Sequence, residues 1–125
     1  MEITKVIETA KANGYKAYKV EPYTDWAWLI TPKGNVMGVC KAQWGTGVVF
    51  TLKYKANRNS GTGCSCHEST EEWDFGVKNV TVDDLVKYEL SGIEYARELN
   101  ASFYGNAEEF LDYQRKFWDD KVREI

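Results

Sequence analysis

The first residues of the chain place apolar side chains at the spacing of a helix. Ile3, Val6, Ile7 and Ala10 recur at intervals of three and four, which puts them on one helical face. Asn13-Gly14 follows, and glycine often ends a helix because it adopts a left-handed conformation at no steric cost. The pattern therefore predicts a short N-terminal helix.

Four stretches rich in β-branched and aromatic residues come next. They cover residues 15–20, 27–31, 36–42 and 47–54, with short polar segments between them. Pro32-Lys-Gly-Asn35 is a strong turn signal, since proline presets φ and glycine accepts a positive φ. Four strands with short connections predict an antiparallel meander.

The final third of the chain returns to helical spacing. Thr81-Val-Asp-Asp84 looks like a helix start with carboxylates in the first turn. An apolar stripe runs from Leu85 to Leu99 with one polar interruption at Glu89, and Ser91-Gly92 is expected to break this helix into two pieces. Asn106-Ala-Glu-Glu109 begins a second helix.

The second helix is expected to continue to the C-terminus, because four side chains recur at intervals of three or four residues. These are Phe110, Tyr113, Phe117 and Lys121. The whole chain, residues 1–125, is then one α+β domain. It has a short N-terminal helix, a four-stranded antiparallel meander sheet and two C-terminal helices covering it, with the helices expected on one face.

Composition narrows the classes of protein. There is no run of 18 apolar residues, so no transmembrane span is expected, and the charged N-terminus does not resemble a signal peptide. These features predict a cytoplasmic protein without a membrane partner. Three cysteines in a reducing compartment favour free thiols or metal binding over disulfides.

Charge is distributed unevenly along the chain. Residues 1–63 carry nine Lys and Arg against four Asp and Glu, whereas residues 81–125 carry six against eleven. The first part is suited to a phosphorylated ligand. The acidic second part argues against binding long nucleic acid, which needs a continuous basic surface.

One segment concentrates candidate chemistry directly after the fourth strand. The segment 53–67 combines lysine, arginine, Gly, Ser, Asn and Thr residues, two cysteines and the single histidine. Such a segment is suited to an anion, because backbone N–H groups and a guanidinium converge on phosphate oxygens. A solvated surface loop is the alternative. The anion site would use Arg58, Asn59, Ser60, Gly61, Thr62 and Gly63.

The same segment offers possible metal ligands. Cys64, Cys66 and His67 could chelate zinc, but a tetrahedral site normally has two ligand pairs, and Cys-x-Cys-His lacks the usual spacing. We therefore expect no metal and no cofactor, and the role of these three residues stays open. The neighbouring Cys66 and His67 side chains would point apart in an extended chain, so we expect no cysteine-based enzyme.

Aromatic residues form 14% of the chain, which is more than the core of a small domain requires. Trp26 and Trp28 share one strand face and are expected in the core. Trp44, in a glycine-flanked turn, and Tyr54 are candidates for stacking on a base. The last helix carries more aromatic surface than is needed to cover the sheet, which predicts a homo-oligomer that forms through this helix. The aromatic residues are Phe110, Tyr113, Phe117 and Trp118.

Two arginines complete the candidate site. Arg115 and Arg123 are eight residues apart, near one face of the expected last helix. Pairing with Asp112, Asp119 and Asp120 is the simpler role. If the helix lines a subunit interface, the same arginines could close over an anionic ligand.

The run 54–66 (Tyr-Lys-Ala-Asn-Arg-Asn-Ser-Gly-Thr-Gly-Cys-Ser-Cys), after a Trp-Gly-x-Gly turn and before two helices, resembles small proteins of phages and prophages. The order of sheet first and helices last is similar to the Thoeris anti-defence family of cyclic-nucleotide sponges. The resemblance implies an oligomer that sequesters a cyclic ADP-ribose-type signal or cyclic oligonucleotide in an infected bacterial cell, without cleaving it. It implies ligand contacts from the segment and from Arg123.

The leading hypothesis is thus a sponge for a small cyclic nucleotide. Two alternatives stay open. One is a protein–protein inhibitor of a host defence nuclease, of the anti-CRISPR type, which would use the acidic C-terminal part. The other is a small zinc-binding interaction module.

Overall fold

The computed structural model describes residues 3–41, 48–54, 67–73, 80–98 and 106–125, and within 67–73 it describes the backbone alone. Its core is a six-stranded antiparallel sheet with strand order β5-β4-β3-β2-β1-β6. The strands are β1 (Lys16–Val20), β2 (Trp26–Ile30), β3 (Val36–Lys41), β4 (Val48–Tyr54), β5 (His67–Trp73) and β6 (Val122–Glu124). The helices are α1 (Ile3–Ala12), α2 (Val82–Glu98) and α3 (Ala107–Phe117).

The α+β prediction is confirmed, and all four expected strands are present as the meander β1–β4. Two strands were not expected. β5 begins at His67, inside the segment interpreted as a loop, and pairs along its whole length with β4. β6 pairs with β1 at the opposite edge, so the chain returns to the sheet after its last helix.

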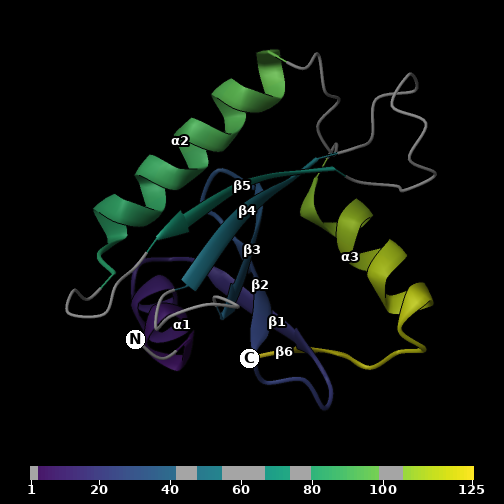
Figure 1. The fold of residues 1–125 in the computed structure, drawn as a ribbon. Coiled ribbons are helices and arrows are strands. Elements are labelled where there is room, and N and C mark those ends of the chain that lie inside the picture. The colour runs from purple at the N-terminus through teal and green to yellow at the C-terminus, as the bar shows by residue number, and fades with distance from the viewer. Residues whose placement is uncertain (1–2, 42–47, 55–66, 74–79, 99–105) are drawn as a thin grey trace.

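The helices lie on both faces of the sheet, so the expectation of a single covered face was wrong (Figure 1). α1 and α2 cover one face, and α3 covers the other. The separation follows from strand alternation: in β2, Ala27 and Leu29 pack in the α1/α2 core, while Trp28 and Ile30 pack beneath α3. The result is a three-layer arrangement with one core on each side.

α2 is continuous through Ser91-Gly92, so the predicted break is wrong. Gly92 is buried, as are Glu89 and Ala96 on the same side of the helix. Packing of this face against the sheet outweighs the weak helix propensity of one glycine.

The buried side of α2 carries a carboxylate that ties the helix to the β2–β3 turn. Glu89 is 2% exposed, and its Oε2 accepts hydrogen bonds from Thr31 Oγ1 at 2.6 Å and Asn35 Nδ2 at 2.8 Å. Burial and the nearby Glu89 charge raise the pKa of Tyr15. The polar interruption seen in the helical stripe is therefore an anchor within the α1/α2 core.

α3 begins at the predicted cap, where Asn106 accepts a hydrogen bond from the Glu109 backbone N–H at 3.0 Å. The prediction that this helix continues to the C-terminus is wrong, because α3 ends at Phe117. Asp119 and Asp120 adopt positive φ values of 51° and 60°, which aspartate tolerates better than most residues. The chain reverses there, and Val122 reaches the core beneath α3 as part of β6.

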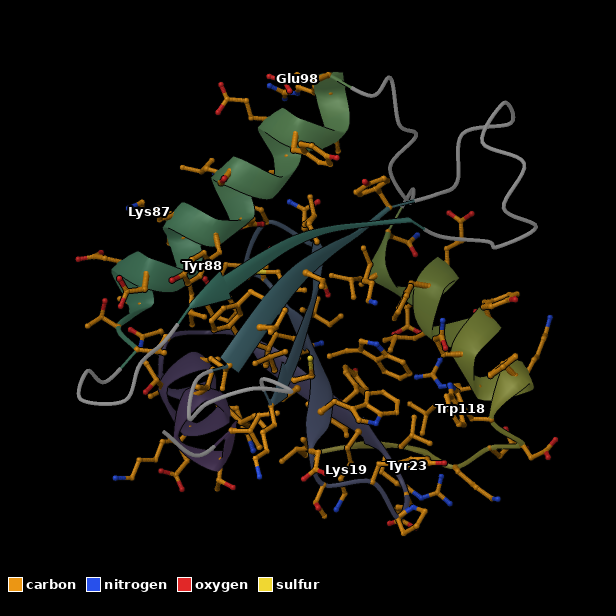
Figure 2. All side chains as sticks on the ribbon, in the orientation of Figure 1. Lys19, Tyr23, Lys87, Tyr88, Glu98 and Trp118 are labelled. Carbon is orange, nitrogen blue, oxygen red and sulfur yellow. The ribbon has the colours of Figure 1, made fainter. Side chains whose placement is uncertain are left out.

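No helix in the described ranges is both long enough and apolar enough to cross a bilayer. Figure 2 shows polar side chains such as Lys87 and Glu98 along the outer side of α2, and Tyr88 turned toward the sheet. The arrangement leaves α1 and α2 with one core-facing side each.

Candidate functional site

The segment expected to bind phosphate falls outside the described residues. This applies to Arg58, Asn59, Ser60, Gly61, Thr62 and Gly63, and to Trp44. Their assignment as ligand contacts stays a prediction from the sequence. Cys64 and Cys66 also lie outside, and of His67 the structure describes the backbone alone, at the start of β5.

Tyr54 was a candidate for stacking on a base, and its position does not suit that role. Its side chain is 2% exposed and belongs to the α1/α2 core. Burial raises the pKa of its hydroxyl. Because both ring faces are enclosed by the core, Tyr54 stabilises the fold and offers no open platform.

The two candidate arginines contact residues close to them in the sequence. Arg115 Nη1 binds Glu108 Oε2 at 3.0 Å and Asp112 Oδ1 at 2.9 Å, so the simpler ion-pair interpretation is confirmed for Asp112. These carboxylates raise the pKa of Arg115. Arg123 lies on β6 and donates to the backbone oxygens of Asp120 and Val122, so it does not share a helix face with Arg115.

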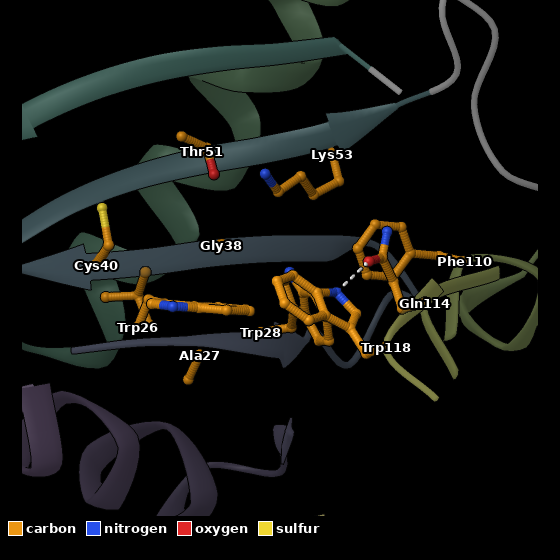
Figure 3. A pocket seen from close by; sticks show the side chains of 11 residues that line it. Trp26, Ala27, Trp28, Gly38, Cys40, Thr51, Lys53, Phe110, Gln114 and Trp118 are labelled. Atoms are coloured by element: carbon orange, nitrogen blue, oxygen red, sulfur yellow. Dashed lines mark hydrogen bonds between the residues drawn. The ribbon is translucent and has the colours of Figure 1, made fainter. Parts of the chain in front are cut away.

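A different site lies on the α3 side of the sheet. A cavity of about 320 Å³ opens between α3 and strands β2, β3 and β4 (Figure 3). Its principal lining residues are Trp26, Trp28, Gly38, Cys40, Thr51, Lys53, Phe110, Gln114 and Trp118. We call this cavity the tryptophan groove.

The floor of the tryptophan groove is set by strand register. Trp28 on β2 pairs with Gly38 on β3, and Gly38 pairs with Thr51 on β4, so the three form one row across the sheet. A Cβ at Gly38 would lie 2.5 Å from Thr51 Oγ1 and 3.1 Å from Lys53 Cε. The side chains of Thr51 and Lys53 therefore lie close over Gly38, and a larger residue at this position would crowd them.

One wall of the groove is aromatic. The ring centroids of Trp26 and Trp28 lie 5.2 Å apart at 67°, and Trp26 lies 5.7 Å from Trp118 at 46°. Phe110 meets Trp28 edge-on at 5.2 Å. Trp118 is fixed by a hydrogen bond from its Nε1 to Gln114 Oε1 at 3.1 Å. Trp26 and Trp118 are half-buried, so part of each ring remains accessible for contact with a ligand.

The opposite wall is polar and basic. Thr51 and Lys53 extend from β4, and Figure 3 shows them across Gly38 from the tryptophan rings. Cys40 lies at the same wall on β3; burial raises the pKa of its thiol, and the Lys53 charge partly opposes that shift. The groove thus combines flat apolar surfaces with one cation and one hydroxyl, a composition typical of small-molecule sites.

Parts of this site follow from the sequence. The alternation of Trp26 and Trp28 correctly places both on one face, and Trp28 is a core residue as expected, at 5% exposed. Gly38, Thr51 and Lys53 were missed as a group. The signal for them is the Pro32-Lys-Gly-Asn35 turn, which fixes the β2–β3 register, but their meeting also depends on the β3–β4 pairing.

No metal centre is seen among the described side chains, where no three His, Cys, Asp or Glu residues gather closely enough to hold an ion. Comparison with protein-family models, curated proteins and solved structures finds no match for the chain. A function therefore has to be argued from the chemistry of the tryptophan groove.

Proposed function

We propose that the protein binds a small anion of the nucleotide class, with a planar base, in the tryptophan groove. The observation that supports this most directly is the lining of the groove, which combines the rings of Trp26 and Trp118 with Lys53 in one cavity. A heteroaromatic base would stack on Trp26 or Trp118, and its phosphate would face Lys53.

The size of the groove limits what it encloses. Ligand pockets commonly measure about 300–1,000 Å³, and this groove, at about 320 Å³, is at the lower end. It suits one base and the adjoining phosphate. A cyclic ADP-ribose-type signal or cyclic oligonucleotide would place its remaining atoms outside the groove.

The proposed role is sequestration, with no chemical step. A protein that holds a signalling nucleotide without cleaving it would act as the anti-defence sponge that the sequence resemblance implies. Continuity of the chain adds support, since Lys53 is the first residue of the basic segment expected to bind phosphate, and Arg58 follows five residues later.

Isothermal titration calorimetry can test the groove directly, with AMP, cyclic AMP, cyclic ADP-ribose and adenosine as probes. Lys53→Met should weaken binding of the phosphorylated probes by about ten- to a hundredfold, because a charged hydrogen bond contributes about 1.5–3 kcal/mol. Adenosine, which has no phosphate, should lose little affinity. Lys33→Met, in the exposed β2–β3 turn, is the matched control and should behave as wild type.

Two results would contradict the proposal. One is the absence of binding by any nucleotide at millimolar concentration, which would redirect attention to a macromolecular partner. The other is equal affinity of wild type and Lys53→Met for every probe. If Arg58→Ala lowers affinity while Lys53→Met does not, the site lies in the segment and not in the groove. Ligand recovered after heating should be chemically intact by mass spectrometry.

A further inference from the structure

The outer side of α3 carries aromatic residues that belong to neither core. Tyr113 and Phe117 are 46% and 64% exposed, and their rings stack with centroids 6.5 Å apart. Phe117 also meets Trp118 edge-on at 5.1 Å. Phe117 is the most exposed of the large apolar residues in the described part of the chain. Rings exposed in this way are typical of surfaces that another protein covers.

The charges of α3 are sorted along its length. Its first turn holds Glu108 and Glu109, and its last turn holds Arg115 and Lys116. Arg115 binds carboxylates of its own helix. Glu109, Tyr113 and Lys116 fall at i, i+4 and i+7, so they share one side of the helix. That side therefore reads acidic, aromatic, basic from its start to its end.

When a second copy of the helix lies antiparallel to the first, its basic end faces the acidic end of the first copy. We infer that the outer side of α3 docks against α3 of a second copy of this chain, antiparallel, around a two-fold axis. In a two-fold interface each residue meets its reciprocal partner on the other copy. An axis beside Tyr113, midway between Glu109 and Lys116, places Glu109 against Lys116 of the partner subunit, and the reverse contact forms as well.

The charge pattern favours a second copy over a partner of one sign. A nucleic acid would attract Lys116 and repel Glu109, and an acidic protein surface would do the same. An antiparallel copy matches both charges while it covers Tyr113 and Phe117. A helix of 11 residues is about 16 Å long, so the interface is at the small end of the known range, and dissociation in the micromolar range is expected.

Sedimentation velocity over a series from low to high micromolar tests this inference. Wild type should shift from monomer to dimer, and Phe117→Ser should remain monomeric throughout. Glu109→Lys and Lys116→Glu should each weaken the dimer about tenfold, because each reversal creates two repulsive pairs. The double variant Glu109→Lys with Lys116→Glu should restore the wild-type constant, since the pairs are re-formed with exchanged signs.

A matched control separates the interface from helix stability. Glu108→Lys makes the same charge change in the same turn, about 100° around the helix, and also removes the ion pair with Arg115; it should still leave the dimer intact. A wild-type monomer at every concentration would overturn the inference. So would a double variant that fails to restore association, or a Glu108→Lys effect equal to that of Glu109→Lys.

Discussion

The two faces of the sheet are closed to different degrees. On the α1/α2 face, large side chains such as Leu29, Met37 and Phe50 are almost completely buried. On the α3 face, the shorter helix covers Trp28 and Val36 but leaves the tryptophan groove beside them. Among the described residues, one face of the sheet therefore carries almost completely buried large side chains, and the other face carries a cavity.

The polar groups of the two faces also differ in their surroundings. On the closed face, Glu89 is satisfied by Thr31 and Asn35 of the same chain. On the open face, Thr51 and Lys53 line a cavity. The comparison leads us to expect larger losses of stability from substitutions on the α1/α2 face and larger losses of binding from substitutions on the α3 face.

The largest expected effect is on the closed face. Phe50→Ala should lower the free energy of unfolding by about 3–5 kcal/mol, because a large ring stacked on Tyr88 at 4.6 Å is replaced by a cavity. Urea denaturation gives the value. Trp118→Ala, on the open face, should cost less than half as much while it abolishes nucleotide binding. Equal losses of stability would contradict the assignment of different roles to the two faces.

The Glu89 anchor should give an intermediate effect. Glu89→Leu removes the acceptor for Thr31 and Asn35, and leaving these donors unsatisfied should cost about 2–4 kcal/mol. Glu89→Gln keeps an acceptor oxygen and should cost less. Nucleotide affinity, measured by calorimetry in both variants, should not change, because the groove is on the other face. A loss of affinity would show that the faces are coupled.

Gly38→Ala gives the smallest change in stability and the sharpest test of the groove. The new Cβ would crowd Thr51 Oγ1, and overpacking of this kind costs about 1–3 kcal/mol. Nucleotide binding should be lost, because the methyl group fills the floor. Adding Thr51→Ala should recover most of the stability without restoring the ligand space. Unchanged binding in Gly38→Ala would place the ligand elsewhere.

The elements that could be predicted are those defined by neighbours in sequence. The meander strands and the Asn106 cap depend on local alternation and a local hydrogen bond. β6 could not be predicted, because Val122–Glu124 is short and charged and becomes a strand only by pairing with β1. The groove could not be predicted for the same reason, because Gly38 and Lys53 become neighbours only through the register of the β3–β4 pairing.

The pairing of β6 with β1 also has a consequence for the order of folding. Tyr18 donates to Glu124 Oε1 at 3.0 Å across a separation of 106 residues, whereas the meander forms between adjacent segments. Contacts so distant along the chain form slowly, since a long loop must close first. On the ribosome, one edge of β1 would stay unpaired until residues 122–124 emerge. In that interval the unpaired edge of β1 can pair with another chain.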